Sequence, residues 1–360
     1  MQKKKTIGFS YSISFTILLF LLLSFGTLFV FEASTAESLV TFGTPYFLLK
    51  QHFSALIIGS VAFVAGILIP ATFWITISPV LYWSSIVLLI ATLIPGLGLD
   101  LNGARRWLAL GPIRFQTVEL LKFAIPAYFA HWMSYSQKFS AFLFLTALPA
   151  ILIILQPDLG SLLLILGISV SIFFISGGEL KKLGMLAAAG IPLILITIVF
   201  SPYRLKRLTT FINPDSDPLG ASFHIRQITL ALGRGGWFGQ GLGNSQQKFS
   251  YIPEASTDSI FAIVAEEVGF IGSVLIIAIF LAFLFSAFKL IQNAHKGPVL
   301  TLFGTGIVVW FTIQTVLNLS AVVGLVPLTG VPLPFFSYGR TSLVMLLFAS
   351  GVLLRIGREK

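Results

Sequence analysis

Long apolar segments separated by short polar ones make up most of this chain. Ten segments approach the ~20 residues that a helix needs to cross a bilayer, at about 11–30, 53–70, 72–93, 115–135, 139–155, 160–175, 183–200, 259–290, 299–320 and 341–354. The connections between them are short, except for one that runs from 201 to 257. The pattern predicts an all-α polytopic membrane protein with about ten transmembrane helices and one long loop.

The composition supports this class. Hydrophobic residues account for 56% of the 360 positions and charged residues for 10%, and the mean hydropathy is +0.96. A soluble domain carries about 25% charged residues. No internal repeat and no second domain is visible, so we expect residues 1–360 to form a single membrane domain.

Positive charge near the predicted helix ends sets the orientation. Lys3, Lys4 and Lys5 precede the first segment, and the positive-inside rule therefore places the amino terminus in the cytoplasm. With ten segments the carboxyl terminus also falls inside, as do the connections that carry further cations: Lys138, Lys181, Lys182, Lys289, Lys296, Arg355, Arg358 and Lys360. We expect both termini to be cytoplasmic and the loop 201–257 to be extracytoplasmic. The net charge of +10 follows this membrane pattern, which argues against a nucleic-acid partner.

The first segment resembles a cleavable signal in one respect. Lysines precede it, and residues 34–36 are small. Its apolar run of about 20 residues is longer than the core of a signal peptide. We therefore expect a retained helix.

Ten cations nevertheless fall on the predicted outer side: Arg105, Arg106, Arg114, Arg204, Lys206, Arg207, Arg226, Arg234, Lys248 and Arg340. Long translocated loops tolerate positive charge, so a solvated surface is one explanation. The connection that carries Arg105 and Arg106 is short, which favours an anionic ligand. Beside a membrane, a lipid phosphate or diphosphate fits these arginines and lysines best.

Three carboxylates lie near the start of the segment 259–290. Asp258 begins it, and Glu266 and Glu267 follow about two turns deeper. An ionised Asp at membrane depth costs ~2.5–3.5 kcal/mol and marks function by default. Residues 256–259 are also typical of a helix start, so an N-cap role for Asp258 is the alternative, and the two roles are compatible. Glu266 is ~12 Å further along a helix, too far to share one proton, and we interpret Glu266 and Glu267 as parts of polar networks.

Two more acids lie near predicted helix ends. Glu119 and Lys122 are three residues apart, so they share a helix face, where they form either a structural ion pair or part of a site. Asp158 stands in the motif 156–160 at the mouth of the next helix, where an N-cap is the alternative to a functional role.

Three other stretches have turn-like or helix-like composition. Residues 222–232 have helix-like spacing inside the long loop. The glycine-rich run 233–248 lacks the order of a P-loop, so it does not indicate nucleotide binding. Prolines in 324–342 need neighbours or a cavity at membrane depth, which predicts that this stretch, with Ser337, lines an outward-facing cavity.

The chain has no cysteine, and its four histidines show no metal-ligand spacing. Structural disulfides, thiol catalysis and a metalloenzyme built on His and Cys are therefore excluded.

These motifs occur in the order seen in the SEDS family, the FtsW, RodA and SpoVE proteins of bacterial wall synthesis. The resemblance spans nearly the whole chain and rests on 102–107, 115–116 with Glu119, 156–160, the glycine-rich run ending in Lys248, 253–267 and 332–339. FtsW is the most similar member, with RodA close behind. The family usually has Pro and Ser at Thr117 and Val118, Phe at Ser259, and a second Gly at Arg340. No expected acid is missing, and Arg340 adds a cation.

The resemblance implies a peptidoglycan glycosyltransferase of the bacterial cytoplasmic membrane that polymerises lipid II at its outer face with inversion. By the same resemblance Asp258 is the catalytic base, and Arg105, Arg106 and Lys248 neutralise the leaving diphosphate. Glu119, Lys122, Asp158 and Ser337 complete the expected substrate site. A divalent cation, Mg²⁺ or Mn²⁺, is suggested, and no nucleotide is.

The implied partners are lipid II, undecaprenyl-linked glycan and a class B penicillin-binding transpeptidase. Division and elongation remain open as the cellular role. A lipid II flippase is the alternative function. A transporter offers polar groups along the full bilayer depth, whereas here they concentrate at the outer end, which favours the enzyme.

Overall fold

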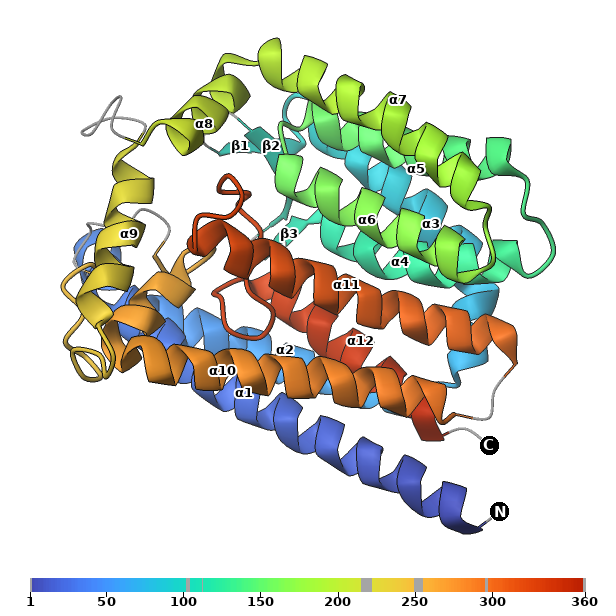
Figure 1. The fold of residues 1–360 in the computed structure, drawn as a ribbon, viewed down its shortest axis with the longest axis horizontal. Coiled ribbons are helices and arrows are strands. Elements are labelled where there is room, and N and C mark those ends of the chain that lie inside the picture. The colour runs from blue at the N-terminus through green and yellow to red at the C-terminus, as the bar shows by residue number, and fades with distance from the viewer. Residues whose placement is uncertain are drawn as a thin grey trace.

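The computed structural model describes residues 2–101, 104–111, 113–214, 222–248, 255–294 and 297–358. Long helices run between two ends of a bundle (Figure 1). The helices of the bundle are α1 (Gln2–Phe42), α2 (Phe47–Leu68), α3 (Ala71–Leu93), α4 (Thr117–Met133), α5 (Phe139–Leu155), α6 (Leu159–Ile175), α7 (Leu180–Val199), α10 (Ile260–Gln292), α11 (Pro298–Val322) and α12 (Arg340–Arg358). The shorter elements are α8 (Pro202–Ile212), α9 (Phe223–Gly235), β1 (Gly98–Leu101), β2 (Ala104–Leu110) and β3 (Ile113–Gln116).

The multi-pass helical architecture is confirmed. Within the described residues, seven helices are long and apolar enough to cross a membrane: α1, α2, α3, α7, α10, α11 and α12. The helices α5 and α6 are apolar but have 17 residues each. The helix α4 also has 17 residues and carries Glu119 and Lys122. Every predicted segment contains a helix, while the count of ten crossings stays a prediction.

The most buried helix lies at the centre of the bundle. The helix α4 packs against α3, α6 and α11, and most of its side chains are buried, including Phe123 and Phe129. The helix α12 packs along α2, and α1 packs along α10. By contrast, α7 at the edge of the bundle exposes large apolar side chains along its length, as expected of a helix that faces lipid (Figure 1).

A small sheet at one end of the bundle was not predicted. The strands β1, β2 and β3 form an antiparallel sheet in that order, and Leu108 pairs with Phe115. Ala104 and Leu108 are both buried. Side chains alternate between the two faces of a strand, so the neighbours Arg105 and Arg106 point to opposite sides. The all-α class is thus correct for the bundle but misses this sheet.

The helix predicted over 259–290 is present but broken at Gly269, whose φ of 71° and ψ of −171° are not helical. The break leaves backbone groups without helical partners, and the glycine-rich run supplies them. Gln240 N–H donates to Glu266 O at 2.9 Å, and Phe270 N–H donates to Gly236 O at 2.8 Å. A Cβ at Gly239 would lie 2.1 Å from the Glu267 carbonyl oxygen. Glycines here permit close approach to the protein's own backbone.

The long loop 201–257 contains α8 and α9, and α9 confirms the helix predicted from the spacing of 222–232. Two contacts bring this loop to the end of the bundle that carries Asp258. Arg207 Nη1 donates to Leu328 O at 3.0 Å, and His224 Nε2 lies 2.8 Å from Ser259 Oγ.

Candidate functional site

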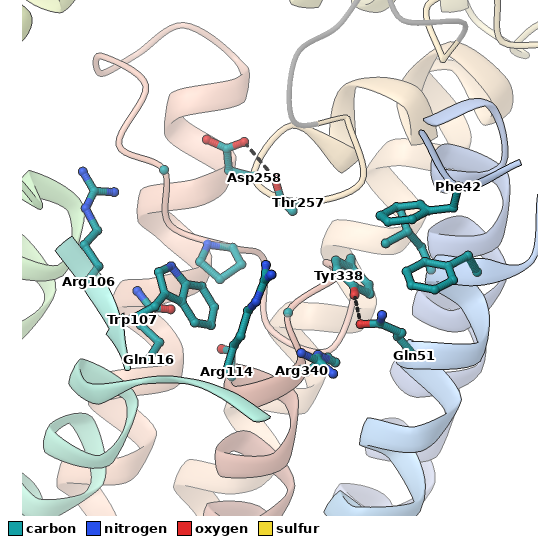
Figure 2. Close-up of a pocket in the computed structure, with 16 residues that line it drawn as sticks. Phe42, Gln51, Arg106, Trp107, Arg114, Gln116, Thr257, Asp258, Tyr338 and Arg340 are labelled. Atoms are coloured by element: carbon teal, nitrogen blue, oxygen red, sulfur yellow. Dashed lines mark hydrogen bonds between the residues drawn. The ribbon is translucent and has the colours of Figure 1, made fainter. Parts of the chain in front are cut away.

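A cavity of about 580 Å³ opens beside the sheet, and Figure 2 shows the side chains around it. Segments far apart in the sequence meet here: the end of α1, the start of α2, the sheet, the turn before α10, and the stretch that leads into α12. The lining residues are Phe42, Phe47, Leu48, Gln51, Arg106, Trp107, Arg114, Gln116, Thr257, Asp258, Gly330, Pro332, Tyr338, Gly339, Arg340 and Ser342. The cavity therefore combines a carboxylate, three guanidinium groups and several aromatic rings.

Asp258 reaches this cavity from the turn that precedes α10. The residue is 6% exposed. The hydroxyls of Thr257 and Ser259 lie 3.4 and 3.5 Å from its Oδ1, and Asn318 Nδ2 donates to its backbone carbonyl at 2.7 Å. Ser259, not Asp258, is the N-cap residue of α10, and it makes no side-chain capping bond. The structure therefore does not support the N-cap alternative for Asp258.

Arg106 is held at the cavity wall by the start of α6. Its Nε donates to Gln156 O at 3.3 Å and lies 3.7 Å from Asp158 Oδ2, and its Nη2 donates to Pro157 O. Asp158 also caps α6, because it accepts from Ser161 N–H at 3.0 Å. The N-cap interpretation of Asp158 is confirmed, and the same carboxylate positions Arg106.

Of the eight residues predicted for the site, the described structure brings Asp258 and Arg106 to the cavity lining. Arg105 points away and pairs with Asp100 at 3.5 Å, with 39% of its side chain exposed. Ser337 is buried, and its Oγ accepts from Leu333 N–H at 2.8 Å, which stabilises the turn before α12.

Glu119 and Lys122 form the structural ion pair that was one of the two interpretations. Their charged atoms are 2.7 Å apart and both side chains are almost fully buried. Lys122 Nζ also lies 3.3 Å from Gln314 Oε1 and 5.7 Å from the centre of the Trp310 ring. The pair stabilises α4 against α11 and does not line the cavity.

Lys248 also lies away from the cavity, in a buried cluster. Its Nζ is 3.0 Å from Glu32 Oε2, 3.4 Å from Glu267 Oε1 and 2.7 Å from Gly243 O. Glu266 accepts hydrogen bonds from Ser245 Oγ and from Gln247 N–H. The interpretation of Glu266 and Glu267 as parts of polar networks therefore agrees with the geometry.

Sequence reasoning did not assign Glu32 to this cluster. The helix α1 runs to Phe42, beyond the predicted end near residue 30, and this extension carries Glu32. An acid so close to the end of an apolar segment was the available signal.

Sequence reasoning also did not place several cavity residues in the site. Arg340 belongs to the stretch 324–342 that was predicted to line a cavity, and it does so, whereas Arg114 was recognised only as an outer cation. Tyr338 Oη donates to Gln51 Oε1 at 3.1 Å across the cavity, and its N–H donates to Ser256 O at 2.8 Å. Phe42 and Phe47 stack with ring centres 3.9 Å apart. These rings give one wall an apolar surface suited to a sugar face or a prenyl chain.

His224 contacts the turn that holds Asp258. Burial, together with the smaller effect of the positive charge of Arg207, lowers the pKa of His224 to about 4. The imidazole is therefore neutral at pH 7, and its hydrogen bond with Ser259 does not bring a second charge next to Asp258.

The described part of the chain contains no group of three His, Asp or Glu side chains arranged to hold a metal ion. Within the cavity, Asp258 is the carboxylate among the described lining residues. These residues do not fit a metal site made from protein ligands alone.

The fold and the cavity define a multi-pass helical membrane protein with a carboxylate and arginines facing one cavity at one end. The family model described as "Cell cycle protein", for FtsW, RodA and SpoVE, matches residues 13–360. The chain therefore belongs to this family.

Individual relatives cover almost the whole chain. It is 37% identical over 353 residues to the probable peptidoglycan glycosyltransferase FtsW of Shewanella sediminis, which covers 94% of this chain and 85% of the relative. It is 36% identical over 378 residues to stage V sporulation protein E of Bacillus subtilis, with 99% of each chain covered. A solved structure described as "Structural coordination of polymerization and crosslinking by a peptidoglycan synthase complex" superposes with a TM-score of 0.79, 28% identity and 96% of each chain covered.

Proposed function

We propose that this chain is a peptidoglycan glycosyltransferase that polymerises lipid II, and that the cavity with Asp258 is its active site. The family to which the chain belongs makes it a glycosyltransferase of cell-wall synthesis. The observation that carries the assignment of the site is the position of Asp258 on the wall of a cavity that Arg106 also lines. A base and a cation facing one space are what sugar transfer from a diphosphate requires.

In the proposed reaction, Asp258 accepts the proton of the 4-hydroxyl group of the acceptor N-acetylglucosamine. The oxygen attacks the anomeric carbon of the lipid-linked donor from the face opposite its diphosphate. A new C–O bond forms, the bond from the anomeric carbon to the diphosphate oxygen breaks, and its electron pair leaves with undecaprenyl diphosphate. One displacement inverts the anomeric centre. Arg106 stabilises the negative charge that develops on the leaving oxygen.

We place this reaction at the outer face of the membrane. Both chain termini lie at one end of the bundle, and α9 lies at the other end, beside the turn before α10 (Figure 1). Lys3, Lys4 and Lys5 at the amino terminus favour the cytoplasm for the first end. Both termini are then cytoplasmic, and the cavity faces outward, where lipid-linked substrates reach it from the membrane plane.

We propose a class B penicillin-binding transpeptidase as the partner. The solved structure with the TM-score of 0.79 is described as a complex that coordinates polymerization and crosslinking. A strand polymerised at the outer face needs a crosslinking enzyme on the same side, which supports this kind of partner.

If the reaction uses a divalent cation, the carboxylate of Asp258 would be its ligand among the described cavity residues, and the cation would neutralise diphosphate charge. We assign no step to it. Polymer synthesis should be measured with Mg²⁺, with Mn²⁺ and with a chelator.

The test uses full-length protein purified in detergent with its transpeptidase partner and labelled lipid II. We expect glycan polymer without nucleotide, because donor and acceptor supply both the sugars and the leaving group. Transport has no meaning in detergent, so polymer under these conditions separates the enzyme from the flippase. Headgroup translocation in liposomes, together with no polymer in detergent at any metal condition, would instead favour the flippase.

A further inference from the structure

Two arginines of the cavity have no role in the reaction described above. Arg114 lies in β3, and Arg340 is the first residue of α12. Figure 2 shows Arg114 reaching up into the cavity with Arg340 beside it, and Trp107 between Arg114 and Arg106. The strand and the helix start touch, because Thr341 Oγ1 donates to Arg114 O at 3.5 Å.

These two arginines differ from Arg105 and Arg106 in their surroundings. Arg105 pairs with Asp100 and Arg106 with Asp158. Among the described residues, neither Arg114 nor Arg340 forms an ion pair with a carboxylate. Two like charges on one wall repel each other, and the repulsion is greater beside protein than in bulk water. An anion in the cavity would remove this cost.

Tyr338 lies close to both cations. Burial raises the pKa of the Tyr338 phenol, and the positive charge of Arg340 and that of Arg114 both oppose this rise, whereas Glu37 adds to it. Both guanidinium groups therefore act on the same hydroxyl at the cavity wall.

A buried hydroxyl supplies a further donor at the same place. Ser342 is 6% exposed and lines the cavity, and its Oγ has no hydrogen-bond partner among the described residues. A buried hydroxyl without a partner carries an uncompensated desolvation penalty, which a bound anion would remove. Ser342 lies in the first turn of α12, a helix of 19 residues. The first backbone N–H groups of a helix lack helical partners, and the helix dipole favours a negative charge there.

We infer that Arg114, Arg340, Ser342 and the first turn of α12 form a second anion subsite that binds the diphosphate of a prenyl-linked substrate. The inference rests on the proposed function for its substrate class. Donor and acceptor each carry a diphosphate, so two diphosphates must lie near Asp258. Arg106 serves one of them, and the new subsite serves the other. The two guanidinium groups together carry two positive charges, which match a ligand with two to three negative charges.

The direct test is binding without turnover. Full-length protein in detergent is titrated with undecaprenyl diphosphate, and the Kd is compared for wild type, Arg340→Gln, Arg114→Gln and Arg340→Lys. A charge-assisted hydrogen bond contributes about 1.5–3 kcal/mol, so we expect the Kd to rise at least about tenfold for each Gln variant. Arg340→Lys should lie between, because lysine keeps the charge but loses the bidentate geometry.

Arg234→Gln is the matched control. It removes one exposed outer arginine that does not line the cavity, so its Kd should equal that of wild type. Elution volume and unfolding temperature of each variant establish that it is folded. A Kd unchanged in both folded Gln variants would overturn the inference.

Steady-state kinetics show which substrate, the donor or lipid II, places its diphosphate in the subsite. Polymer synthesis is measured with the glycan-linked donor varied at fixed lipid II, and then with lipid II varied at fixed donor. A rise of the apparent KM in one series for Arg340→Gln, with little change in kcat, identifies that substrate as the occupant. Binding that depends on Arg340 in a protein that makes no polymer would keep the subsite and reject the glycosyltransferase. Polymer synthesis by the wild-type protein, together with a Kd that Arg340→Gln leaves unaltered, would keep the glycosyltransferase and reject the subsite.

Discussion

The acids near the start of α10 occupy two different environments. Asp258 lines an open cavity together with three arginines. Glu266 and Glu267 lie within α10 and are each 1% exposed, and Ser245, Gln247 and Lys248 donate to them. Their depth in an apolar segment made all three acids candidates for function, and the spacing along the helix already assigned Glu266 and Glu267 to polar networks. A buried acid with protein partners stabilises structure, whereas an acid on a cavity wall is able to meet a substrate.

The partners of the buried acids show what this second environment is for. The glycine-rich run binds the broken backbone of α10 through Glu266 O and Glu267 O, and Lys248 binds Glu267 and Glu32 with its ammonium group. These contacts tie the long loop to α1 and α10. Glu266, Glu267 and Lys248 are not among the described residues that line the cavity of Asp258.

The largest effect should come from Asp258→Asn. Asparagine keeps the shape but cannot accept the proton, and general base catalysis contributes about 10²–10⁴-fold. We expect polymer synthesis to fall by about that factor, with an unchanged unfolding temperature and unchanged partner binding. Synthesis near the wild-type rate would remove Asp258 from the role of base.

Lys248→Met should lose stability and keep substrate binding, whereas Asp258→Asn should lose activity and keep stability. Removal of one partner from a buried ion pair costs about 3–5 kcal/mol, because Glu267 and Glu32 lose their counter-ion. The expected result is a much lower unfolding temperature with undecaprenyl diphosphate binding retained in the folded fraction.

The control for this variant is Lys182→Met, at an exposed pair in which Glu179 is 64% exposed. Such a pair contributes about 0–1 kcal/mol. If Lys248→Met instead keeps its stability and loses binding, Lys248 belongs to the substrate site.

Gly239→Ala tests the contact between the glycine-rich run and α10. Gly239 has a φ of 81°, and a Cβ there would meet the Glu267 carbonyl. The backbone conformation alone costs about 1–3 kcal/mol for a residue with a side chain. Gly190→Ala in α7 is the control, because a Cβ there meets nothing within 4 Å, and alanine in a helix should stabilise by about 0.5–1 kcal/mol. Equal unfolding temperatures for the two variants would contradict the contact.

The smallest effect distinguishes two neighbouring arginines. Arg106→Gln should weaken turnover by about tenfold, the equivalent of one charge-assisted hydrogen bond. Arg105→Gln should change turnover by less than about twofold, because Arg105 faces solvent and its exposed ion pair contributes little. The measurement is the steady-state rate of polymer synthesis from lipid II for each variant. Equal losses in both variants would mean that both arginines reach the substrate.

The membrane class and most helices followed from the sequence because burial in lipid requires long apolar runs, and such runs are visible in one dimension. The position of α9 and the N-cap at Asp158 also followed, since both depend on residues within a few positions of each other. Asp258 and Arg106 were found through local motifs.

Only the tertiary structure separated the cavity residues from the structural ones. Arg105 and Arg106 are adjacent in the chain, and the pairing of β2 with its neighbours sends them to opposite faces. Lys248 pairs with Glu32, which is 216 positions away, and Arg340 reaches the same cavity as Arg114 because α12 begins beside β3. Apolar length is a property of a segment, so sequence determined which parts enter the membrane. Which charges are neutralised depends on neighbours brought together by packing, so the fold decided which of them remain for a ligand.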